Sequence, residues 1–271
     1  MAEQKPHITH KPITELVSLF RKRALITGAA AGIGRAIAHR FAEASADLEL
    51  VDINAQGLSV VKNELAQFHH EVNTHKVDIS SKEAIDSLWD DLRGREPDIL
   101  VNNAGIYPFK SFLETDTDFL KKVMDINLQS AFLMCHHMIQ RRLKKGGVII
   151  NVSSIEAIMP FAEGLVAYDI SKTGVIGLTR GLAKEFGRRG FRINVMIPGG
   201  IMTPGTRAVA KEITQFNLGL LKTGYDFKSR LPMNRGGQPD EVARVALFLA
   251  SDLSSYVHGA LVAVDGGFLS A

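Results

Sequence analysis

Cysteine is almost absent from this chain of 271 residues: Cys135 stands alone, so no internal disulfide can form. No stretch approaches the roughly 20 consecutive apolar residues that a membrane-spanning helix needs, which argues against a membrane protein. The first twenty residues mix Lys, His, Pro and Glu and lack the apolar run of a secretory signal. We therefore expect a cytoplasmic protein in which residues 1–20 form an N-terminal extension outside the core.

An excess of one charge is also missing. The 32 basic and 29 acidic residues give a formal net charge of +3 without a dense Lys/Arg block, so nucleic acid is a poor candidate partner. No metal site is expected, because Cys135, His136 and His137 are adjacent and lack further ligands at suitable spacing. What is present is 45% hydrophobic and 23% charged residues, the composition of a globular protein with a large core.

Short apolar and β-branched runs recur along the chain, and segments with helical spacing lie between them. Ile33, Ile37 and Phe41, for example, share one helical face. Strands that alternate with helices predict an α/β fold, a single domain over residues 21–271 with a parallel sheet covered on both faces. The seven predicted strands are residues 24–27, 48–51, 74–77, 99–101, 148–152, 193–197 and 261–264.

The least regular part of the chain is residues 203–238, which is rich in Gly and Pro. Such a stretch inside a regular domain is typical of a lid or binding loop. We predict a substrate loop here, and the alternative is a plain surface excursion.

A glycine-rich turn follows the first predicted strand, with the sequence Thr27-Gly28-Ala29-Ala30-Ala31-Gly32-Ile33-Gly34. Glycines allow backbone to approach a pyrophosphate, and the N-terminal amides of the following helix face the anion. A tight turn without a ligand is the alternative. Asp52 ends the second predicted strand eighteen residues after Gly34, where a carboxylate can bind an adenosine ribose and repel a 2′-phosphate.

These features predict a dinucleotide site that prefers NAD, with NADP less favoured. Two observations could weaken the argument. Asp52 could instead cap the next helix or form a turn before Asn54. Arg35 could reach a 2′-phosphate, although such a residue more often lies on a solvated helix face.

Tyr168 and Lys172 are four residues apart, so on a helix they share one face and can act on one ligand. Tyrosine, with a pKa of about 10, is a poor base at neutral pH. A nearby ammonium and a positively charged nicotinamide would favour the phenolate, and lowering the pKa by three units requires roughly 4 kcal/mol. We expect Tyr168 to exchange an alcohol proton while hydride passes to or from the nicotinamide.

A serine pair follows the fifth predicted strand in Asn151-Val152-Ser153-Ser154. The Ser154 hydroxyl can hydrogen-bond the reacting oxygen and place it against Tyr168, and Ser153 stays open as the alternative.

Together these motifs resemble the short-chain dehydrogenase/reductase family. The resemblance rests on the glycine-rich turn, Asn102-Asn103-Ala104-Gly105, Tyr168-Asp169-Ile170-Ser171-Lys172 and Pro198-Gly199, and it runs to the Val264-Asp265-Gly266-Gly267 ending. It implies a doubly wound Rossmann-type fold, hydride transfer between NAD(P) and a secondary alcohol or ketone, and a homotetramer. The fourteen residues from Ser154 to Tyr168 are one more than the resemblance implies, which leaves the choice of serine open.

The resemblance also implies roles for residues. Asn127 would complete a catalytic tetrad with Ser154, Tyr168 and Lys172 by anchoring a water, and Lys172 would also hold the nicotinamide ribose. Asparagine is a mediocre helix former, so its place in a helical segment supports a special role, and a satisfied polar residue between helices is the alternative. The cofactor-binding residues, besides Tyr168 and Lys172, would be Gly28, Gly32, Ile33, Gly34, Asp52, Asp78, Ile79, Asn103, Ala104, Gly105, Pro198, Gly199, Ile201 and Thr203.

The substrate is predicted from loop residues near the expected pocket. Ser154, Glu156, Glu163 and Tyr168 are the predicted substrate-binding residues, and Tyr107, Phe109, Met159 and Phe161 are also expected to face the pocket. A carboxylate such as Glu156 could bind several hydroxyls or an ammonium group and would repel an anionic acyl carrier. The sequence thus favours a sugar, polyol or other small polar hydroxylated compound, although Glu156 and Glu163 could be solvated loop charges.

Two other functions compete. One is an NADPH-dependent 3-oxoacyl-thioester reductase of the same fold, against which Asp52 and the lack of a basic residue at Ala31 argue. The other is a catalytically silent NAD-binding sensor or scaffold, which would need no Ser154, Tyr168 and Lys172 together.

Overall fold

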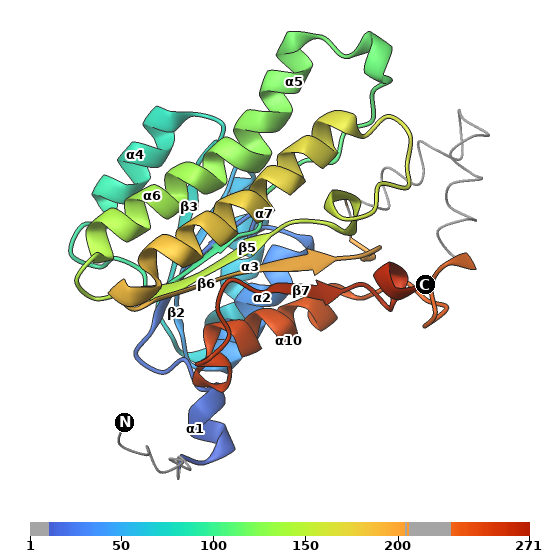
Figure 1. Cartoon of the computed structure of the whole chain (residues 1–271). Coiled ribbons are helices and arrows are strands. Elements are labelled where there is room, and N and C mark those ends of the chain that lie inside the picture. Colours follow the sequence, from blue (N-terminus) through green and yellow to red (C-terminus); the bar gives the residue numbers. More distant parts are fainter. Residues whose placement is uncertain (1–10, 204, 206–228) are drawn as a thin grey trace, which may run out of the picture.

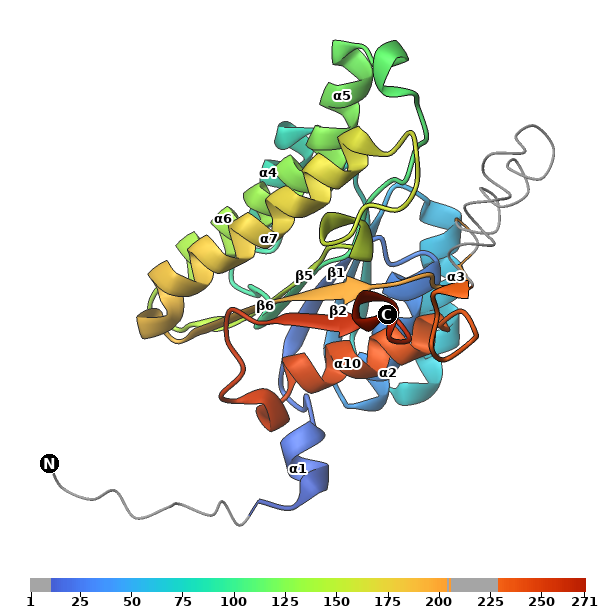
Figure 2. The same cartoon turned by 45° about the vertical axis from the view of Figure 1, so that its right-hand side comes forward.

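A computed structural model describes residues 11–203, 205 and 229–271 (Figures 1 and 2). In this part of the chain a seven-stranded parallel sheet with strand order β3-β2-β1-β4-β5-β6-β7 carries helices on both faces, which confirms the predicted fold class. The strands are β1 (Arg23–Thr27), β2 (Asp47–Asp52), β3 (Val72–Lys76), β4 (Ile99–Asn102), β5 (Gly147–Val152), β6 (Phe191–Pro198) and β7 (Leu261–Val264).

The helices form two layers around this sheet. In Figures 1 and 2, α4, α6 and α7 lie over one face, whereas α2, α3 and α10 lie over the other. The described α-helices are α1 (Ile13–Val17), α2 (Gly32–Glu43), α3 (Ala55–Leu65), α4 (Lys82–Asp91), α5 (Thr117–Met124), α6 (Ser130–Arg142), α7 (Val166–Phe186) and α10 (Pro239–Ala250).

Both faces of the central strands are buried, which explains their continuous apolar sequences. Successive side chains of a strand point to opposite faces. Ala24 and Ile26 of β1 accordingly join the core cluster that includes Phe41 of α2, whereas Leu25 joins the cluster that includes Trp89 of α4. Because all the strand pairs are parallel, the residues that follow the carboxyl ends of the strands lie at one edge of the sheet.

The strand order reverses between β1 and β4, since β2 and β3 lie on one side of β1 and β4 to β7 on the other. Ligands of open parallel sheets bind outside the carboxyl ends of the strands at such a reversal. The glycine-rich turn after β1 and the Asn102–Gly105 segment after β4 flank this position.

The N-terminal extension is less separate from the core than the sequence predicts. Leu19 is 1% exposed and belongs to the core cluster of α2, and its amide donates to the Ala44 carbonyl at 2.7 Å. Within the extension, α1 is followed by this buried residue, so the core begins before residue 21. Residues 1–10 lie outside the described residues.

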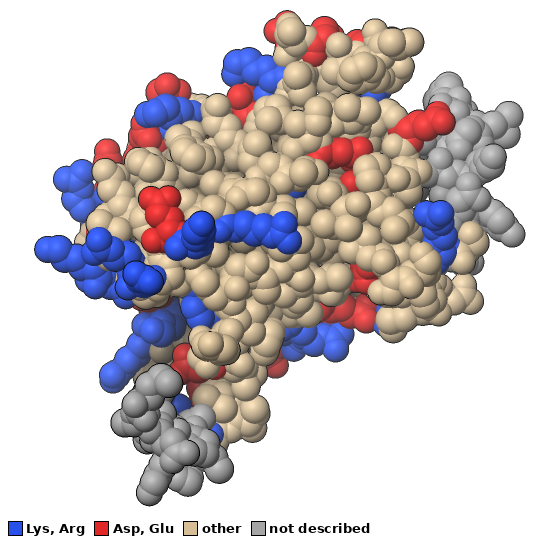
Figure 3. All heavy atoms as spheres, viewed as in Figure 1, with Lys and Arg blue, Asp and Glu red and all other residues tan. Residues whose placement is uncertain are grey.

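Most of the predicted substrate loop, residues 204 and 206–228, also lies outside the described residues. Ile201, two residues before the loop, forms a parallel bridge with Gly237 near the end of the loop. Within the described ranges, no helix combines the length and apolar character that crossing a membrane requires. On the face drawn in Figure 3, basic and acidic side chains are interspersed.

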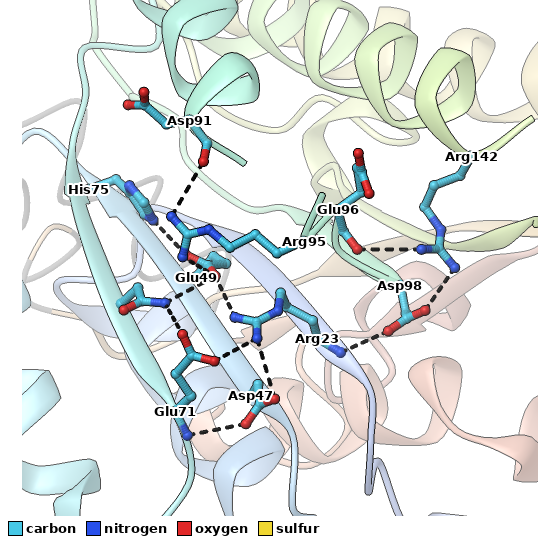
Figure 4. Close-up of polar contacts among 11 residues, drawn as sticks. Arg23, Asp47, Glu49, Glu71, His75, Asp91, Arg95, Glu96, Asp98 and Arg142 are labelled. Carbon is cyan, nitrogen blue, oxygen red and sulfur yellow. Dashed lines mark hydrogen bonds and ion pairs between the residues drawn. The ribbon is translucent and has the colours of Figure 1, made fainter. Parts of the chain in front are cut away.

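An ion network joins the amino ends of β1, β2 and β3, opposite the edge where the turns converge (Figure 4). Glu49 of β2 is fully buried, and its carboxylate accepts from Arg23 at 2.6 Å, lies 2.6 Å from the His75 ring and 3.3 Å from Arg95. Burial would raise the pKa of Glu49, but these hydrogen bonds and charges hold it below its usual range. The network links side chains of three neighbouring strands.

Candidate active site

The glycine-rich turn brings strand β1 and helix α2 into direct contact. Gly28 has a φ of +66°, and a Cβ atom there would lie 2.9 Å from the Ala104 Cα. A Cβ atom on Gly34 would overlap the Gly28 carbonyl oxygen. The N-cap of α2, Ala31, makes no side-chain cap hydrogen bond, so backbone amides line a cradle that suits a pyrophosphate.

The segment after β4 holds this turn in place. The Thr27 hydroxyl accepts from the backbone amides of Asn103 and Ala104 at 3.0 and 3.1 Å. The Asn103 side chain donates to the Thr27 carbonyl at 2.9 Å and to that of Gly28 at 3.3 Å. Asn103 and Ala104 therefore shape the cradle, in addition to any contact with a ligand.

Asp52 lies at the end of β2 beside the same turn. One of its carboxylate oxygens accepts from the Ala30 amide at 3.0 Å, and the other from the Asn54 amide at 2.9 Å. Helix α3 is capped by Asn54, and the bond from the Asn54 amide gives Asp52 the turn-forming role that was the alternative to ribose binding. Arg35 is directed elsewhere, because its guanidinium binds both carboxylate oxygens of Glu64, with a 2.9 Å bond from Nε.

Asp78 and Ile79 follow β3 at the same sheet edge. The Asp78 carboxylate accepts from the Ser80 hydroxyl at 2.7 Å and from its amide at 2.9 Å, and these bonds lower the pKa of Asp78. Ile79 packs against the core cluster of α4.

A cavity of about 260 Å³ adjoins the cradle. It brings together residues from the turn after β1 and from the segments after β4, β5 and β6, together with two residues of α7. The lining residues that were predicted from the sequence are Ile33, Asn103, Gly105, Tyr107, Ser153, Ser154, Glu156, Phe161, Tyr168, Lys172, Pro198, Gly199, Ile201 and Thr203.

Tyr168 and Lys172 lie one helical turn apart on α7, as their spacing predicts, and both are buried. Lys172 Nζ donates to the Val152 carbonyl at 3.0 Å and lies 5.9 Å from the centroid of the Tyr168 ring. Burial lowers the pKa of Lys172 to about 8.

The sequence predicts a lowered pKa for the Tyr168 phenol, but the residues around Tyr168 do not lower it. Burial raises the pKa of Tyr168 above its usual value, and the hydrogen bond with Ser154 only partly opposes this. The negative charges of Glu156 and Asp169 act in the same direction as burial and raise the pKa of Tyr168 further. The protein's own groups therefore hold Tyr168 as a neutral acid.

The two serines after β5 have different partners. The Ser153 hydroxyl donates to the Lys172 carbonyl at 2.8 Å, which ties β5 to α7. The Ser154 hydroxyl interacts with Tyr168 and accepts from the Glu156 amide at 3.2 Å. Ser154 is thus the serine whose hydroxyl lies beside Tyr168.

Asn127 lies in a π-helical segment (Asp125–Gln129) between α5 and α6 and is 2% exposed. Its oxygen accepts from the Ile106 amide at 2.8 Å, and its nitrogen donates to the Ile106 carbonyl at 3.0 Å and the Ser171 hydroxyl at 3.1 Å. A Cβ atom on Gly105 would lie 3.1 Å from the Asn127 oxygen and 3.2 Å from Lys172 Nζ. Asn127 therefore lies near Lys172 and also fastens the segment after β4 to α7.

Glu156 lies in a 3-10 turn (Ile155–Ala157) and is 1% exposed. One carboxylate oxygen accepts from the Phe161 amide at 3.0 Å. Burial raises the pKa of Glu156 to about 7. The Tyr107 hydroxyl contacts this carboxyl group, and the Tyr107 ring packs edge-on against Tyr168 with centroids 4.7 Å apart.

Glu163 is a correction to the predicted site. It is exposed and, among the described residues, does not belong to the lining of the cavity. The turn around Gly164, whose carbonyl accepts from the Lys110 amide, carries it outward.

Asp169 was not singled out from the sequence. It follows Tyr168 on α7, its pKa is raised by burial to about 6, and its charge acts on Glu156 and Tyr168. An acidic residue in the first turn of a helix is ordinary, so the sequence carried no signal for its burial.

Known proteins resemble this chain along most of its length. The family model described as enoyl-(acyl carrier protein) reductase matches residues 28–269. A 3-oxoacyl-(acyl-carrier-protein) reductase from Aquifex aeolicus is 34% identical over 256 residues, 93% of this chain and 98% of that protein.

Solved structures agree with this likeness. An NAD(P)-dependent gluconate 5-dehydrogenase from Beutenbergia cavernae, with NADP bound at low occupancy, has a TM-score of 0.87 and 32% identity, and the match covers 94% of this chain and 100% of that one. The L-sorbose reductase from Gluconobacter frateurii, complexed with NADPH and L-sorbose, has a TM-score of 0.86 and 31% identity over 94% and 99% of the two chains.

Proposed function

Because this chain belongs to the short-chain dehydrogenase/reductase family and is an NAD(P)-dependent oxidoreductase of hydroxyl or keto groups, we propose that it acts on a sugar, polyol or similar small polar hydroxylated compound. The observation that carries the proposal is the cavity in which Ser154, Tyr168 and Lys172 meet beside the glycine cradle. The bound nicotinamide supplies or accepts the hydride.

The residues of the chain divide the remaining work. Ser154 hydrogen-bonds the reacting oxygen, and Tyr168 donates a proton to it during ketone reduction or removes that proton during alcohol oxidation. Reduction uses the neutral phenol that burial favours. Lys172 holds the nicotinamide ribose, and Asn127 anchors a water that connects Lys172 with solvent.

The test is Tyr168→Phe. We expect turnover to fall by roughly 10²- to 10⁴-fold, since the proton donor is lost, while cofactor affinity stays within a few-fold. Absorbance of the reduced nicotinamide measures turnover, and calorimetry measures cofactor binding. Tyr256→Phe, at a fully exposed tyrosine, is the matched control. Undiminished turnover of Tyr168→Phe would refute the assignment.

We propose NAD as the preferred cofactor because the Asp52 carboxylate is fixed at the cradle and Arg35 is held by Glu64. Several similar structures hold NADP or NADPH, so the preference needs its own test. Asp52→Ala removes a charge that would repel a 2′-phosphate, and we expect the ratio of kcat/KM for NADP over NAD to rise by about tenfold or more. Glu64→Gln, which releases Arg35, is the comparison variant. A wild-type enzyme that already favours NADP would contradict the proposal.

A second candidate is reduction of a 3-oxoacyl thioester, which the Aquifex relative favours. Reduction of acetoacetyl thioesters, measured beside ketoses with both reduced cofactors, separates the two substrate classes. Carrier-dependent reduction that exceeds ketose reduction would select the second candidate.

We also propose a homotetramer, with support from exposed apolar side chains on the outer helices. Phe132 of α6 and Ile170 of α7 are half exposed, and β7 ends the sheet with a short apolar edge. The roles of the other cofactor-binding residues, and the cytoplasmic location, stay predictions from the sequence.

A further inference from the structure

Two carboxyl groups beside the cavity are incompletely paired. Among the described residues, the buried side-chain polar atoms without a hydrogen-bond partner are Glu156 Oε1, Asp169 Oδ1 and His137 Nδ1. Buried polar groups in folded proteins almost always have partners, so each exception needs a reason. Two of these three atoms belong to acidic groups that act on Tyr168.

Glu156 is held rigidly at the cavity. Its Oε2 accepts from the Phe161 amide at 3.0 Å, and its backbone amide donates to the Ser154 hydroxyl at 3.2 Å. The side chain is almost fully buried yet lines the cavity with Tyr168. A ligand that reaches Tyr168 therefore comes close to the Glu156 carboxyl group, whose Oε1 can still accept a hydrogen bond.

The charges around this carboxyl group are mostly negative. Tyr107 and Tyr168 face it as neutral phenols, and Asp169 adds a second carboxylate from α7. Lys172 is the cationic residue among those that line the described cavity, and its ammonium is turned to the Val152 carbonyl. Nothing in this set would neutralise an anionic substrate.

We propose that Glu156 selects substrates by charge: it accepts a hydrogen bond from a hydroxyl of a neutral polyol or ketose and disfavours a sugar acid. The inference rests on the proposed function and narrows its substrate class. The proposed substrate, a neutral polyol or ketose, resembles the L-sorbose of the sorbose reductase and differs in charge from the gluconate of the gluconate dehydrogenase.

The selection depends on pH. Burial raises the pKa of Glu156 to about 7, so the group is neutral in acid and ionised in mild base. Repulsion between two charges in a partly desolvated site is much stronger than in water. Discrimination against an anion therefore grows as pH rises through neutrality.

The experiment uses glucitol and gluconate, which differ only in a terminal hydroxymethyl or carboxylate group. Binding to the full-length enzyme saturated with reduced cofactor is measured by calorimetry at pH 5.5 and 8.5, and KM is measured for oxidation. At pH 8.5 we expect the wild-type enzyme to bind glucitol at least tenfold more tightly than gluconate. At pH 5.5 the ratio of the two affinities should be smaller. Glu156→Gln should reduce the ratio and weaken its pH dependence, and what remains comes from Asp169 and Lys172, which also titrate in this range. Glu163→Gln, at an exposed residue of the same loop, should change neither the ratio nor its pH dependence.

Other outcomes overturn the inference in distinguishable ways. Equal or tighter binding of gluconate by the wild type, or an unchanged ratio in Glu156→Gln, refutes charge selection and leaves hydride transfer intact. Failure of both compounds to bind refutes the proposed substrate class as well. Tyr168→Phe should lose turnover and retain the binding ratio, so the catalytic role and the selective role are tested separately.

Discussion

Individual side chains show that burial alone does not decide the ionisation of a carboxyl group. Glu49 and Glu156 are both almost fully buried. Glu49 is surrounded by cationic and amide donors, and its pKa is lowered (Figure 4). Glu156 has burial and an acidic neighbour against it and only neutral donors beside it, so its pKa is raised. The partners determine the sign of the shift.

The two glutamates therefore predict opposite pH effects on stability. Ionised Glu49 stabilises the fold above its unfolded pKa of about 4.5, and this contribution is lost as pH falls through the lower folded value. We expect Glu49→Gln to cost about 3 kcal/mol at pH 8, because it unbalances a buried pair, and less in acid.

For Glu156 the sign is reversed. Its folded pKa of about 7 lies above the unfolded value of 4.5, so ionisation destabilises the fold progressively between these values. Glu156→Gln should match the wild type near pH 4 and be more stable at pH 8.5, by up to about 3 kcal/mol. Urea unfolding of the cofactor-free protein measures both variants. A Glu156→Gln protein that is less stable at pH 8.5 would contradict this prediction.

The positions of the candidate catalytic residues were largely predictable because their spacing reports geometry. Tyr168 and Lys172 share a helix face at four residues apart. The partners of the two serines were not predictable, since adjacent residues in a strand end point to opposite sides and only the packed helix α7 decides which side faces Tyr168. The outward position of Glu163 depends on loop contacts that leave no periodic signal.

At the scale of elements, the apolar runs in the sequence predicted the strands of the sheet. No pattern in the sequence predicted the π-helical segment that contains Asn127. An asparagine in a helical pattern indicated a special position. The Asn127 side chain binds the backbone of Ile106, a residue twenty-one positions earlier, and no local pattern records such a contact. Such segments are common at functional sites.

The contact between β1 and α2 gives a prediction for Gly34. An alanine Cβ there would overlap the Gly28 carbonyl oxygen, and backbone cannot move aside as a flexible side chain can. We expect Gly34→Ala to destabilise the protein by about 1–3 kcal/mol and to weaken NAD binding at least tenfold. Thermal unfolding and calorimetry measure the two effects.

The neighbouring Arg35→Ala is the control, because it removes only a surface pair with Glu64, worth at most about 1 kcal/mol. Gly34→Ala with unchanged stability and affinity would show that the turn can open.

For the molecule as a whole, the proposed tetramer places exposed apolar residues against partner chains. Ile170 is 49% exposed on α7, and a charge there would be desolvated in an interface. We expect Ile170→Arg to yield dimers or monomers in light scattering. Val60→Arg, at a 54% exposed residue of α3 on the opposite layer, should leave the mass unchanged. A wild-type monomer would contradict the proposal directly.

The short turn that carries Glu156 begins immediately after Ser154 and returns to α7 before Tyr168. Ile155, Glu156 and Phe161 of this segment line the cavity. Glu156 also binds the Ser154 hydroxyl through its backbone amide and acts on Tyr168 through its charge. Engineers who wish to redirect this catalyst toward new alcohols can therefore randomise Phe161 first, because a change at Glu156 also alters the surroundings of the proton donor.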